Sequence, residues 1–166
     1  MCSNKPFILE DGDLRLRPAK LPDDISIAVV WYQDPEVLYY SEGKDVAPYD
    51  YKIVEKMYNT LASTGELYII EIFVNNKWLP IGDATLSKDS LPIVIGEKEY
   101  RSRGFGKRVL RLLIKRAKEL GLGRLRVKGV YEYNERAKRL FEGAGFQSHV
   151  EFNKEKEKIW IFEMEL

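Results

Sequence analysis

Hydrophobic residues return every three or four positions in several stretches of the chain, as they do on one face of a helix. One such stretch begins near Pro22 and should end before Pro35, because the residue that precedes a proline disfavours helical geometry. The longest apolar stripe runs from Phe105 to Leu120 and is followed by Gly121, a residue type that commonly ends helices. The pattern predicts helices within residues 21–37, 50–64, 104–120 and 134–145.

Other stretches are rich in β-branched and aromatic residues or alternate between apolar and polar positions, which is typical of strands. Asn75 and Asn76 separate two of these runs and predict a tight hairpin. The order of elements is β-α-α-β-β-β-α-β-α-β-β, which predicts one α/β domain over residues 1–166. We expect a mixed, mostly antiparallel sheet of six to seven strands flanked by helices. The predicted strands cover residues 14–18, 66–74, 77–87, 91–96, 124–130, 146–152 and 158–166.

Composition is that of a folded protein, with 45% hydrophobic and 32% charged residues among 166. The single cysteine, Cys2, excludes an internal disulfide framework and a cluster of thiolate metal ligands. The first residues lack the apolar core of a signal peptide, and no apolar run approaches the ~20 residues that a membrane span needs. We therefore expect a cytoplasmic protein without a metal or a membrane partner.

Charge is divided unevenly along the chain. Residues 1–90 carry 9 Lys/Arg and 15 Asp/Glu, whereas residues 91–166 carry 18 and 11. Eight basic residues and no acidic residue lie between Arg101 and Lys118. This division indicates either two surfaces for unlike partners or simply one solvated helix face that is basic.

Glycines interrupt the basic run where a strand gives way to the longest predicted helix. The first turn of a helix has backbone N–H groups without intrahelical partners and a partial positive charge, so it attracts anions. Glycine lets an anion approach the backbone closely, and nearby arginine or lysine neutralises it. The segment therefore predicts a phosphate or pyrophosphate site, although its glycines fit neither the phosphate-loop nor the dinucleotide pattern. The residues concerned are Arg101, Arg103, Gly104, Gly106, Lys107 and Arg108.

Two motifs together resemble those of the GNAT family of acetyl-CoA-dependent N-acetyltransferases. Arg101-x-x-Gly104-x-Gly106 matches the first motif, Gln/Arg-x-x-Gly-x-Gly/Ala, at a strand-to-helix junction. A second match lies one helix and one strand later, at Asn134, Ala137, Leu140, Gly145 and Phe146. The predicted element order also resembles the family fold from Leu14 to the end of the chain. The likeness is thin over residues 19–65, where family members vary with their substrates.

The resemblance implies that the protein uses acetyl-CoA as co-substrate. Backbone groups of the strand before the glycines would pair with the pantetheine arm, and main-chain amides of the glycine segment would hold the pyrophosphate. Asn134 would contact the cofactor, unless it serves only to cap the following helix. The implied cofactor-binding residues are Val94, Ile95, Gly96, Arg101, Ser102, Arg103, Gly104, Phe105, Gly106, Lys107 and Asn134.

The residue that moves the amine proton is not evident, because the chain departs from its family. Phe141 stands where many members have a tyrosine acid, and Gly129 stands where some have a glutamate base. The remaining catalytic candidates are Glu71 and Asp83, which interrupt apolar strands, and Tyr133. Each has a structural alternative, and a site that works by positioning alone is also open. The single histidine, His149, and Cys2 lie outside both motifs and are not expected to act.

The acceptor should lie against the variable region, which is acidic and aromatic. Carboxylates and aromatic faces suit a cationic amine, although some of these aromatic residues should simply pack under the helices. The candidate substrate-binding residues are Trp31, Tyr32, Tyr39 and Glu42. We expect transfer to the primary amine of a small cationic molecule or of a peptide N-terminus, by direct attack in a ternary complex.

Two other functions compete with this hypothesis. A regulatory domain that binds acyl-CoA without turnover would explain Phe141 and Gly129. A nucleic-acid-binding module would explain the basic run, but the aromatic residues gather in the acidic half, so we expect no nucleic-acid partner. The sequence leaves the oligomeric state open, with a homodimer as one option.

Overall fold

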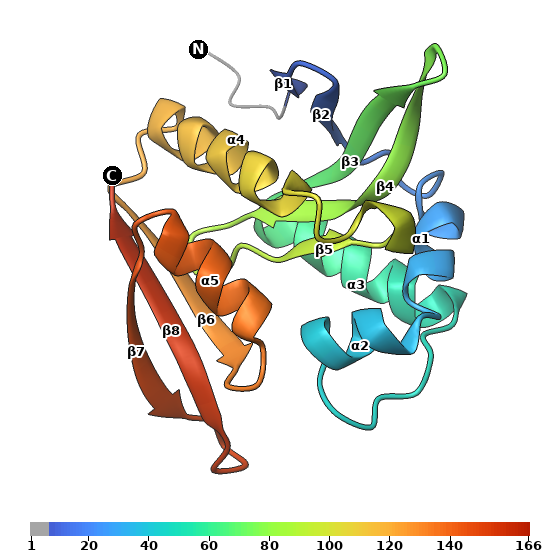
Figure 1. Cartoon of the computed structure of the whole chain (residues 1–166). Coiled ribbons are helices and arrows are strands. Elements are labelled where there is room, and N and C mark those ends of the chain that lie inside the picture. Colours follow the sequence, from blue (N-terminus) through green and yellow to red (C-terminus); the bar gives the residue numbers. More distant parts are fainter. Residues whose placement is uncertain (1–6) are drawn as a thin grey trace.

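The computed structural model describes residues 7–166 and arranges their strands in two sheets (Figure 1). The five-stranded sheet has the order β1-β2-β3-β4-β5 and the three-stranded sheet the order β6-β8-β7, and every neighbouring pair is antiparallel. Cys2 lies outside the described residues. The strands are β1 (Leu9–Asp11), β2 (Leu14–Pro18), β3 (Glu66–Val74), β4 (Lys77–Leu86), β5 (Ile93–Ile95), β6 (Arg124–Tyr131), β7 (Gln147–Phe152) and β8 (Lys158–Glu165).

Helices confirm all four predicted segments: α1 lies within residues 21–37 and ends before Pro35, and the other three segments become α3, α4 and α5. Asp50 caps α3 and Asn134 caps α5, because each side chain accepts a backbone N–H of the first turn. Among the described residues, no helix is both long and apolar enough to cross a membrane. The helices are α1 (Ile25–Trp31), α2 (Pro35–Ser41), α3 (Tyr51–Thr64), α4 (Phe105–Glu119) and α5 (Glu135–Gly143), with a 3₁₀ turn at Lys98–Tyr100.

The structure departs from the sequence prediction in three places. Pro35 was expected to follow a helix, but it is also the first residue of a second helix, α2, which Asp34 caps. Proline is tolerated at this position because the backbone N–H that it lacks would have no intrahelical partner. The three-residue strand β1 was not predicted, because so short a segment carries no alternation. The strands also form two sheets rather than one sheet of six to seven, since the ladders do not join β5 to β6.

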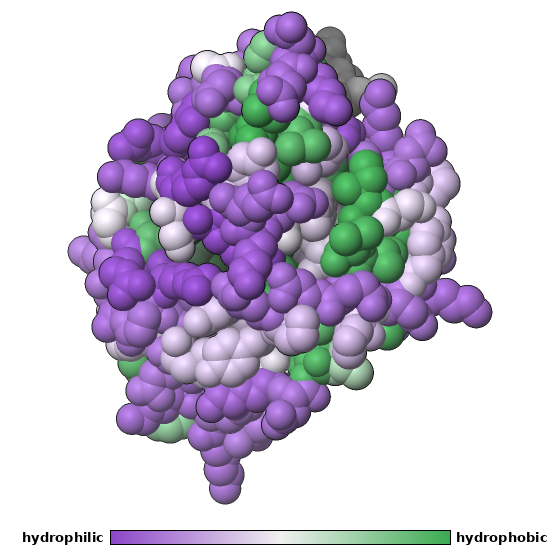
Figure 2. Space-filling model, turned by 45° about the vertical axis from the view of Figure 1, so that its right-hand side comes forward, coloured by the Kyte–Doolittle hydropathy of each residue, from purple (hydrophilic) through white to green (hydrophobic). Residues whose placement is uncertain are grey.

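Alternate residues of β3 face opposite layers. Tyr68, Ile70 and Ile72 pack in a core with α4, whereas Leu67 and Ile69 pack with α1 and α3. A strand with two covered faces is apolar at successive positions, which explains the run from Leu67 to Ile70 in β3. Figure 1 shows α4 and α3 on either side of this sheet. On the molecular surface, hydrophobic residues form separate patches among hydrophilic ones (Figure 2).

The first of these cores extends to the three-stranded sheet and so holds the two sheets together. It includes Val109 and Leu113 of α4 together with Leu125, Val127 and Phe162 of β6 and β8. The sheets are thus joined by side-chain packing on α4 rather than by backbone hydrogen bonds. This arrangement leaves a gap between the facing edges of β5 and β6 that the helices do not fill.

Trp31 of α1 lies flat on the backbone just after β5. A Cβ added at Gly96 would lie 2.1 Å from Cγ of Trp31, far inside van der Waals contact. The indole also donates a hydrogen bond of 2.9 Å from Nε1 to the Glu97 carboxylate. Gly96 is therefore needed for close packing between α1 and the end of β5.

We predict that Gly96→Ala lowers the free energy of unfolding by ~1–3 kcal/mol, because the new methyl group overpacks the indole contact. Chemical denaturation monitored by circular dichroism measures the loss. Gly123→Ala is a matched control, since a Cβ there meets nothing within 4 Å, and it should change stability by less than ~0.5 kcal/mol. Equal effects of the two substitutions would contradict this account.

Asp83 of β4 is buried among tyrosines rather than cations. Tyr32 and Tyr58 donate hydrogen bonds of 2.9 and 2.6 Å to its Oδ2 atom. Burial raises the pKa of Asp83 to about 6, although the two phenols favour the charged form. The same burial keeps both phenols protonated, with pKa values above their ordinary value. The triad joins β4 to α1 and α3.

We predict that Asp83 makes the folded protein less stable as pH rises from about 4 to about 6. In that window the folded state still holds a proton that the unfolded state has released. Above it the penalty is constant at ~3 kcal/mol. Asp83→Asn keeps an acceptor for both phenols and removes the titration. Its stability relative to the unmodified protein should therefore improve across this window, as urea denaturation at several pH values would show. A difference that stays flat with pH would contradict the prediction.

Candidate functional site

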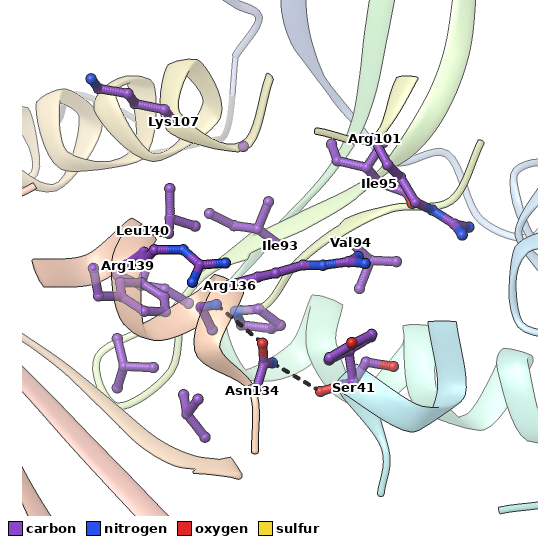
Figure 3. A pocket seen from close by; sticks show the side chains of 18 of the residues that line it. Ser41, Ile93, Val94, Ile95, Arg101, Lys107, Asn134, Arg136, Arg139 and Leu140 are labelled. Atoms are coloured by element: carbon purple, nitrogen blue, oxygen red, sulfur yellow. Dashed lines mark hydrogen bonds between the residues drawn. The ribbon is translucent and has the colours of Figure 1, made fainter. Parts of the chain in front are cut away.

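A cleft of about 620 Å³ lies between the two sheets. Its walls come from β5, the start of α4, β6, α5 and the end of α2 (Figure 3). β5 and β6 are the edge strands of their sheets, so each turns one backbone edge away from its sheet partner. Apolar side chains, including Ile93, Ile95 and Leu140, form much of the lining. The cleft thus combines an apolar wall with a strand edge that still has hydrogen-bonding groups.

The start of α4 opens into this cleft. Gly104 caps the helix with a φ of 83°, a left-handed conformation that favours glycine, and no side chain caps the first turn. A Cβ at Gly104 would meet nothing within 4 Å. No acidic residue lies in the first turn of α4. The free amides, the helix dipole and the open approach make this a site for an anion.

Basic side chains line the same cleft. Lys107 extends from α4, Lys128 from β6, and Arg136 and Arg139 from α5. Arg136 is paired with Glu36 of α2 at 3.0 Å and lies over the ring of Tyr40 at 4.6 Å. Cations from three elements therefore surround a cavity whose helix end already favours negative charge.

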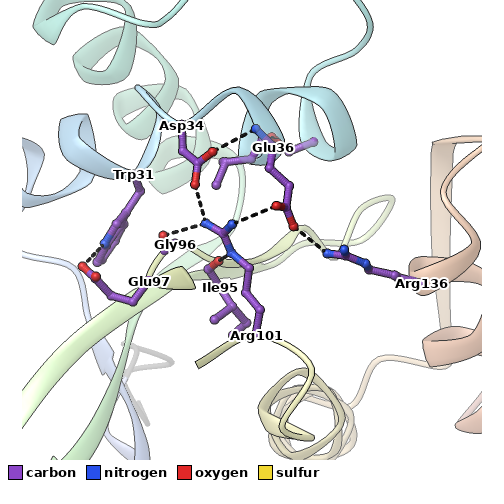
Figure 4. A network of polar contacts seen from close by, with 10 residues as sticks. Trp31, Asp34, Glu36, Ile95, Gly96, Glu97, Arg101 and Arg136 are labelled. Atoms are coloured by element: carbon purple, nitrogen blue, oxygen red, sulfur yellow. Dashed lines mark hydrogen bonds and ion pairs between the residues drawn. The ribbon is translucent and has the colours of Figure 1, made fainter. Parts of the chain in front are cut away.

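Arg101 lines the cleft, but its guanidinium is held by the protein itself (Figure 4). It donates to the backbone oxygens of Ile95 and Gly96 at 2.9 and 2.8 Å, and to the Asp34 carboxylate at 2.9 Å. A second carboxylate, that of Glu36, lies 3.6 Å away. The geometry favours a structural role, in which Arg101 ties the loop before α4 to β5 and to the start of α2.

The other residues predicted to hold the cofactor divide into two groups. Two lie outside the lining: Gly96 packs on Trp31, and the guanidinium of Arg103 lies over the rings of Tyr100 and Phe105. The remaining residues line the cleft. They are Val94, Ile95, Ser102, Gly104, Phe105, Gly106, Lys107 and Asn134.

Asn134 links the two sides of the cleft. Its side-chain oxygen accepts the N–H of Ala137 at 3.1 Å, and its nitrogen donates to the backbone oxygen of Tyr40 at 3.3 Å (Figure 3). The capping interaction is confirmed. The second bond connects α5 to α2 and places the Asn134 side chain in the wall of the cleft.

None of the three catalytic candidates lies in the lining of the cleft. Glu71 is buried on β3 and pairs with Arg15 at 2.7 Å and Arg17 at 3.3 Å. Asp83 is enclosed by the phenols described above. Tyr133 donates its hydroxyl to the backbone oxygen of Tyr39 at 2.7 Å, and burial raises its pKa to about 12. The geometry favours structural roles for Glu71 and Asp83.

The four predicted substrate residues do not form one group either. Trp31 and Tyr32 are buried in the core beside α3. Tyr39 is exposed and packs against Tyr133, with ring centroids 4.5 Å apart. Glu42 is partly buried directly after α2 and accepts a hydrogen bond from Tyr49 at 3.0 Å. Only Tyr39 and Glu42 thus lie near the end of the cleft that α2 forms.

The sequence did not single out several residues of the cleft wall. Glu36, Tyr40 and Ser41 enter it through α2, the helix that was not predicted. Arg139 and Lys128 carry no motif of their own for a phosphate site. The Asp-Pro-Glu sequence at residues 34–36 was the available signal, because aspartate followed by proline is typical of a helix start.

Comparison with known proteins was made by family, by sequence and by fold. The family model described as "Acetyltransferase (GNAT) family" matches residues 27–146. No curated protein sequence gives a significant match. Three solved structures illustrate the fold similarity, each at an identity too low to indicate more than a shared fold.

The first is an aminoglycoside acetyltransferase, AAC(6')-Ib, in complex with coenzyme A. It is 16% identical, with a TM-score of 0.74 over 92% of this chain and 94% of that one. The second is the spermidine N-acetyltransferase of Vibrio cholerae in complex with CoA and spermine. It is 19% identical, with a TM-score of 0.71 over 93% of this chain and 96% of that one. The third is RimL, a ribosomal α-N-protein acetyltransferase in complex with CoA. It is 13% identical, with a TM-score of 0.74 over 96% of this chain and 98% of that one.

The family model covers most of the chain and includes both motifs, from the glycine segment to Phe146. The antiparallel sheets, the flanking helices and the cleft at the start of α4 agree with it. The protein is a member of the GNAT acetyltransferase family.

Proposed function

We propose that this protein is an acetyl-CoA-dependent N-acetyltransferase, with residues 1–166 as one catalytic domain. The observation that carries the proposal is the combination found at the start of α4. A helix end that has a left-handed glycine and no side-chain cap opens into a cleft lined by cations and by the edge of β5 that has no strand partner. This combination suits a molecule that has both phosphates and an amide-containing arm.

The residues present fit coenzyme A. Open space at Gly104 leaves room for a phosphate at the first-turn amides of α4. Lys107, Arg139 and Lys128 would balance the remaining negative charge. The unpaired edge of β5 would accept the amides of the pantetheine arm as a neighbouring strand would.

Bound acetyl-CoA would supply an activated acetyl thioester. The neutral acceptor nitrogen would form the new C–N bond as the C–S bond breaks, and one proton would pass from the amine, through water, to the leaving thiolate, so that coenzyme A departs as a thiol. Holding acceptor and thioester in one cleft converts a bimolecular step into one within a complex. Phe141 packs against Phe146 and Phe162, with ring centroids 5.3 and 5.1 Å away, and its side chain has no proton to donate. We therefore propose that catalysis rests mainly on positioning, with water carrying the proton away.

We predict that Gly104→Glu reduces coenzyme A affinity at least 100-fold, because it places a negative charge at the anion site. Isothermal titration calorimetry with coenzyme A measures the loss. Gly121→Glu is a matched control at the opposite end of α4. Gly121 also has a positive φ, 76°, and a Cβ there would also meet nothing within 4 Å. Equal affinities of the two variants would exclude the proposed phosphate position.

The proposal also predicts turnover. Free thiol should appear when the protein is mixed with acetyl-CoA and primary amines, and mass spectrometry should find the acetylated amine. Stabilisation by coenzyme A without product from any amine would instead support a regulatory acyl-CoA-binding domain. Salt-dependent binding to DNA that coenzyme A does not weaken would support the nucleic-acid alternative.

A further inference from the structure

Glu42 is a partly buried carboxylate without a cationic partner. In the part of the chain that the structure describes, no lysine, arginine or histidine nitrogen lies within ion-pair distance of it. The other buried acids of this half differ: Asp24 and Glu71 pair with arginines, and Asp83 is enclosed by phenols. A buried negative charge without a compensating cation is costly. Binding of a cation from a ligand would therefore stabilise the charged form of Glu42.

Phenol groups surround Glu42. Tyr49 donates its hydroxyl to Oε2 at 3.0 Å, and Tyr131 donates its own to the backbone oxygen at 3.0 Å. The ring of Tyr32 stacks on Tyr49, with centroids 5.9 Å apart. Burial raises the pKa of Glu42 above its ordinary value, as expected for a carboxylate that has only neutral partners. The aromatic faces and the carboxylate together form the kind of surface that binds alkylammonium groups.

The position of Glu42 connects it to the cleft. Glu42 directly follows Ser41, and Tyr131 directly follows Val130; Ser41 and Val130 both line the cleft. Hydrogen bonds from Tyr131, Tyr133 and Asn134 to backbone oxygens at the end of α2 join the two walls here. Glu42 is thus one residue beyond the cleft wall, at the point where hydrogen bonds join the end of α2 to the segment between β6 and α5.

A cation of the chain itself already occupies the neighbouring aromatic surface. Nζ of Lys44 lies 4.8 Å from the ring centroid of Tyr133. Tyr133 stacks on Tyr131, with centroids 5.3 Å apart and rings within 5° of parallel. Glu157, on the turn before β8, adds negative charge near both tyrosines. This wall therefore accepts an ammonium group, and its surroundings are acidic.

We propose that Glu42, with the rings of Tyr49 and Tyr131 beside it, binds an ammonium group of the acceptor. The inference rests on the acetyltransferase function proposed above. The nitrogen that attacks the thioester must be neutral, so the charge held at Glu42 belongs to a second amino group of the same molecule. The acceptor is accordingly a small diamine or polyamine rather than a monoamine.

A pair of acceptors of similar length tests this selectivity. Unmodified protein should acetylate 1,4-diaminobutane with a kcat/KM at least ten times that for n-butylamine. In Glu42→Gln this preference should disappear, chiefly through a rise of ten-fold or more in KM for the diamine. Glu132→Gln removes the same charge from an exposed side chain directly after Tyr131 and should keep the preference. Unchanged diamine kinetics in Glu42→Gln would overturn the proposal and leave the acetyltransferase function intact.

Direct binding separates this inference from catalysis. Calorimetric titration of 1,4-diaminobutane into the coenzyme A complex should show binding that Glu42→Gln weakens at least ten-fold and Tyr49→Phe weakens less. If the protein shows this binding but acetylates no amine, the ammonium-binding site is supported and the acetyltransferase function is refuted. Binding that is equal in all three proteins would refute the site. If Glu42→Gln does not fold, two other results test the site. Weaker diamine binding in Tyr49→Phe and a preference of the unmodified protein for the diamine over the monoamine would support it, and the absence of both would refute it.

Discussion

The cleft exists because two edge strands face each other without pairing. β5 ends one sheet and β6 begins the other, and the two sheets are held together by side-chain packing on α4 and by polar contacts between α2 and the segment after β6. Backbone groups along such an edge normally find a partner in the next strand. Here they face a cavity, so a ligand with amide groups can take the place of that strand. The same separation brings the start of α4 to the rim of the cavity, where it can meet the charged part of that ligand.

The sequence was sufficient to predict the elements with strong local signals. Apolar stripes and capping residues placed α3, α4 and α5, and the asparagine pair placed the hairpin between β3 and β4, where both residues adopt positive φ angles. The helix α2 escaped prediction because Pro35 was interpreted only as a helix breaker. Its absence from the prediction concealed the wall of the cleft that Glu36, Tyr40 and Ser41 provide.

Contacts between residues distant in sequence explain the rest of the differences. The basic run of α4 suggested a charged surface, yet Arg108 pairs with Asp11 and Asp13, and Arg116 pairs with Glu66. Part of the basic run is therefore paired with acidic residues of the other half in the folded molecule. Motif spacing cannot reveal such pairing, because it depends on how β1 and β3 are placed beside α4.

Arg101 has a consequence for how this protein can change over evolution or in the laboratory. One guanidinium holds the end of β5, the loop that leads to the glycines and the start of α2. A new acceptor preference would be sought by exchanging α2 for another segment. Such a graft would have to retain Asp34, or supply an equivalent anchor, because otherwise the cofactor loop would lose its support. Under the proposed function, acceptor choice and cofactor binding would therefore be inherited as one unit rather than as independent modules.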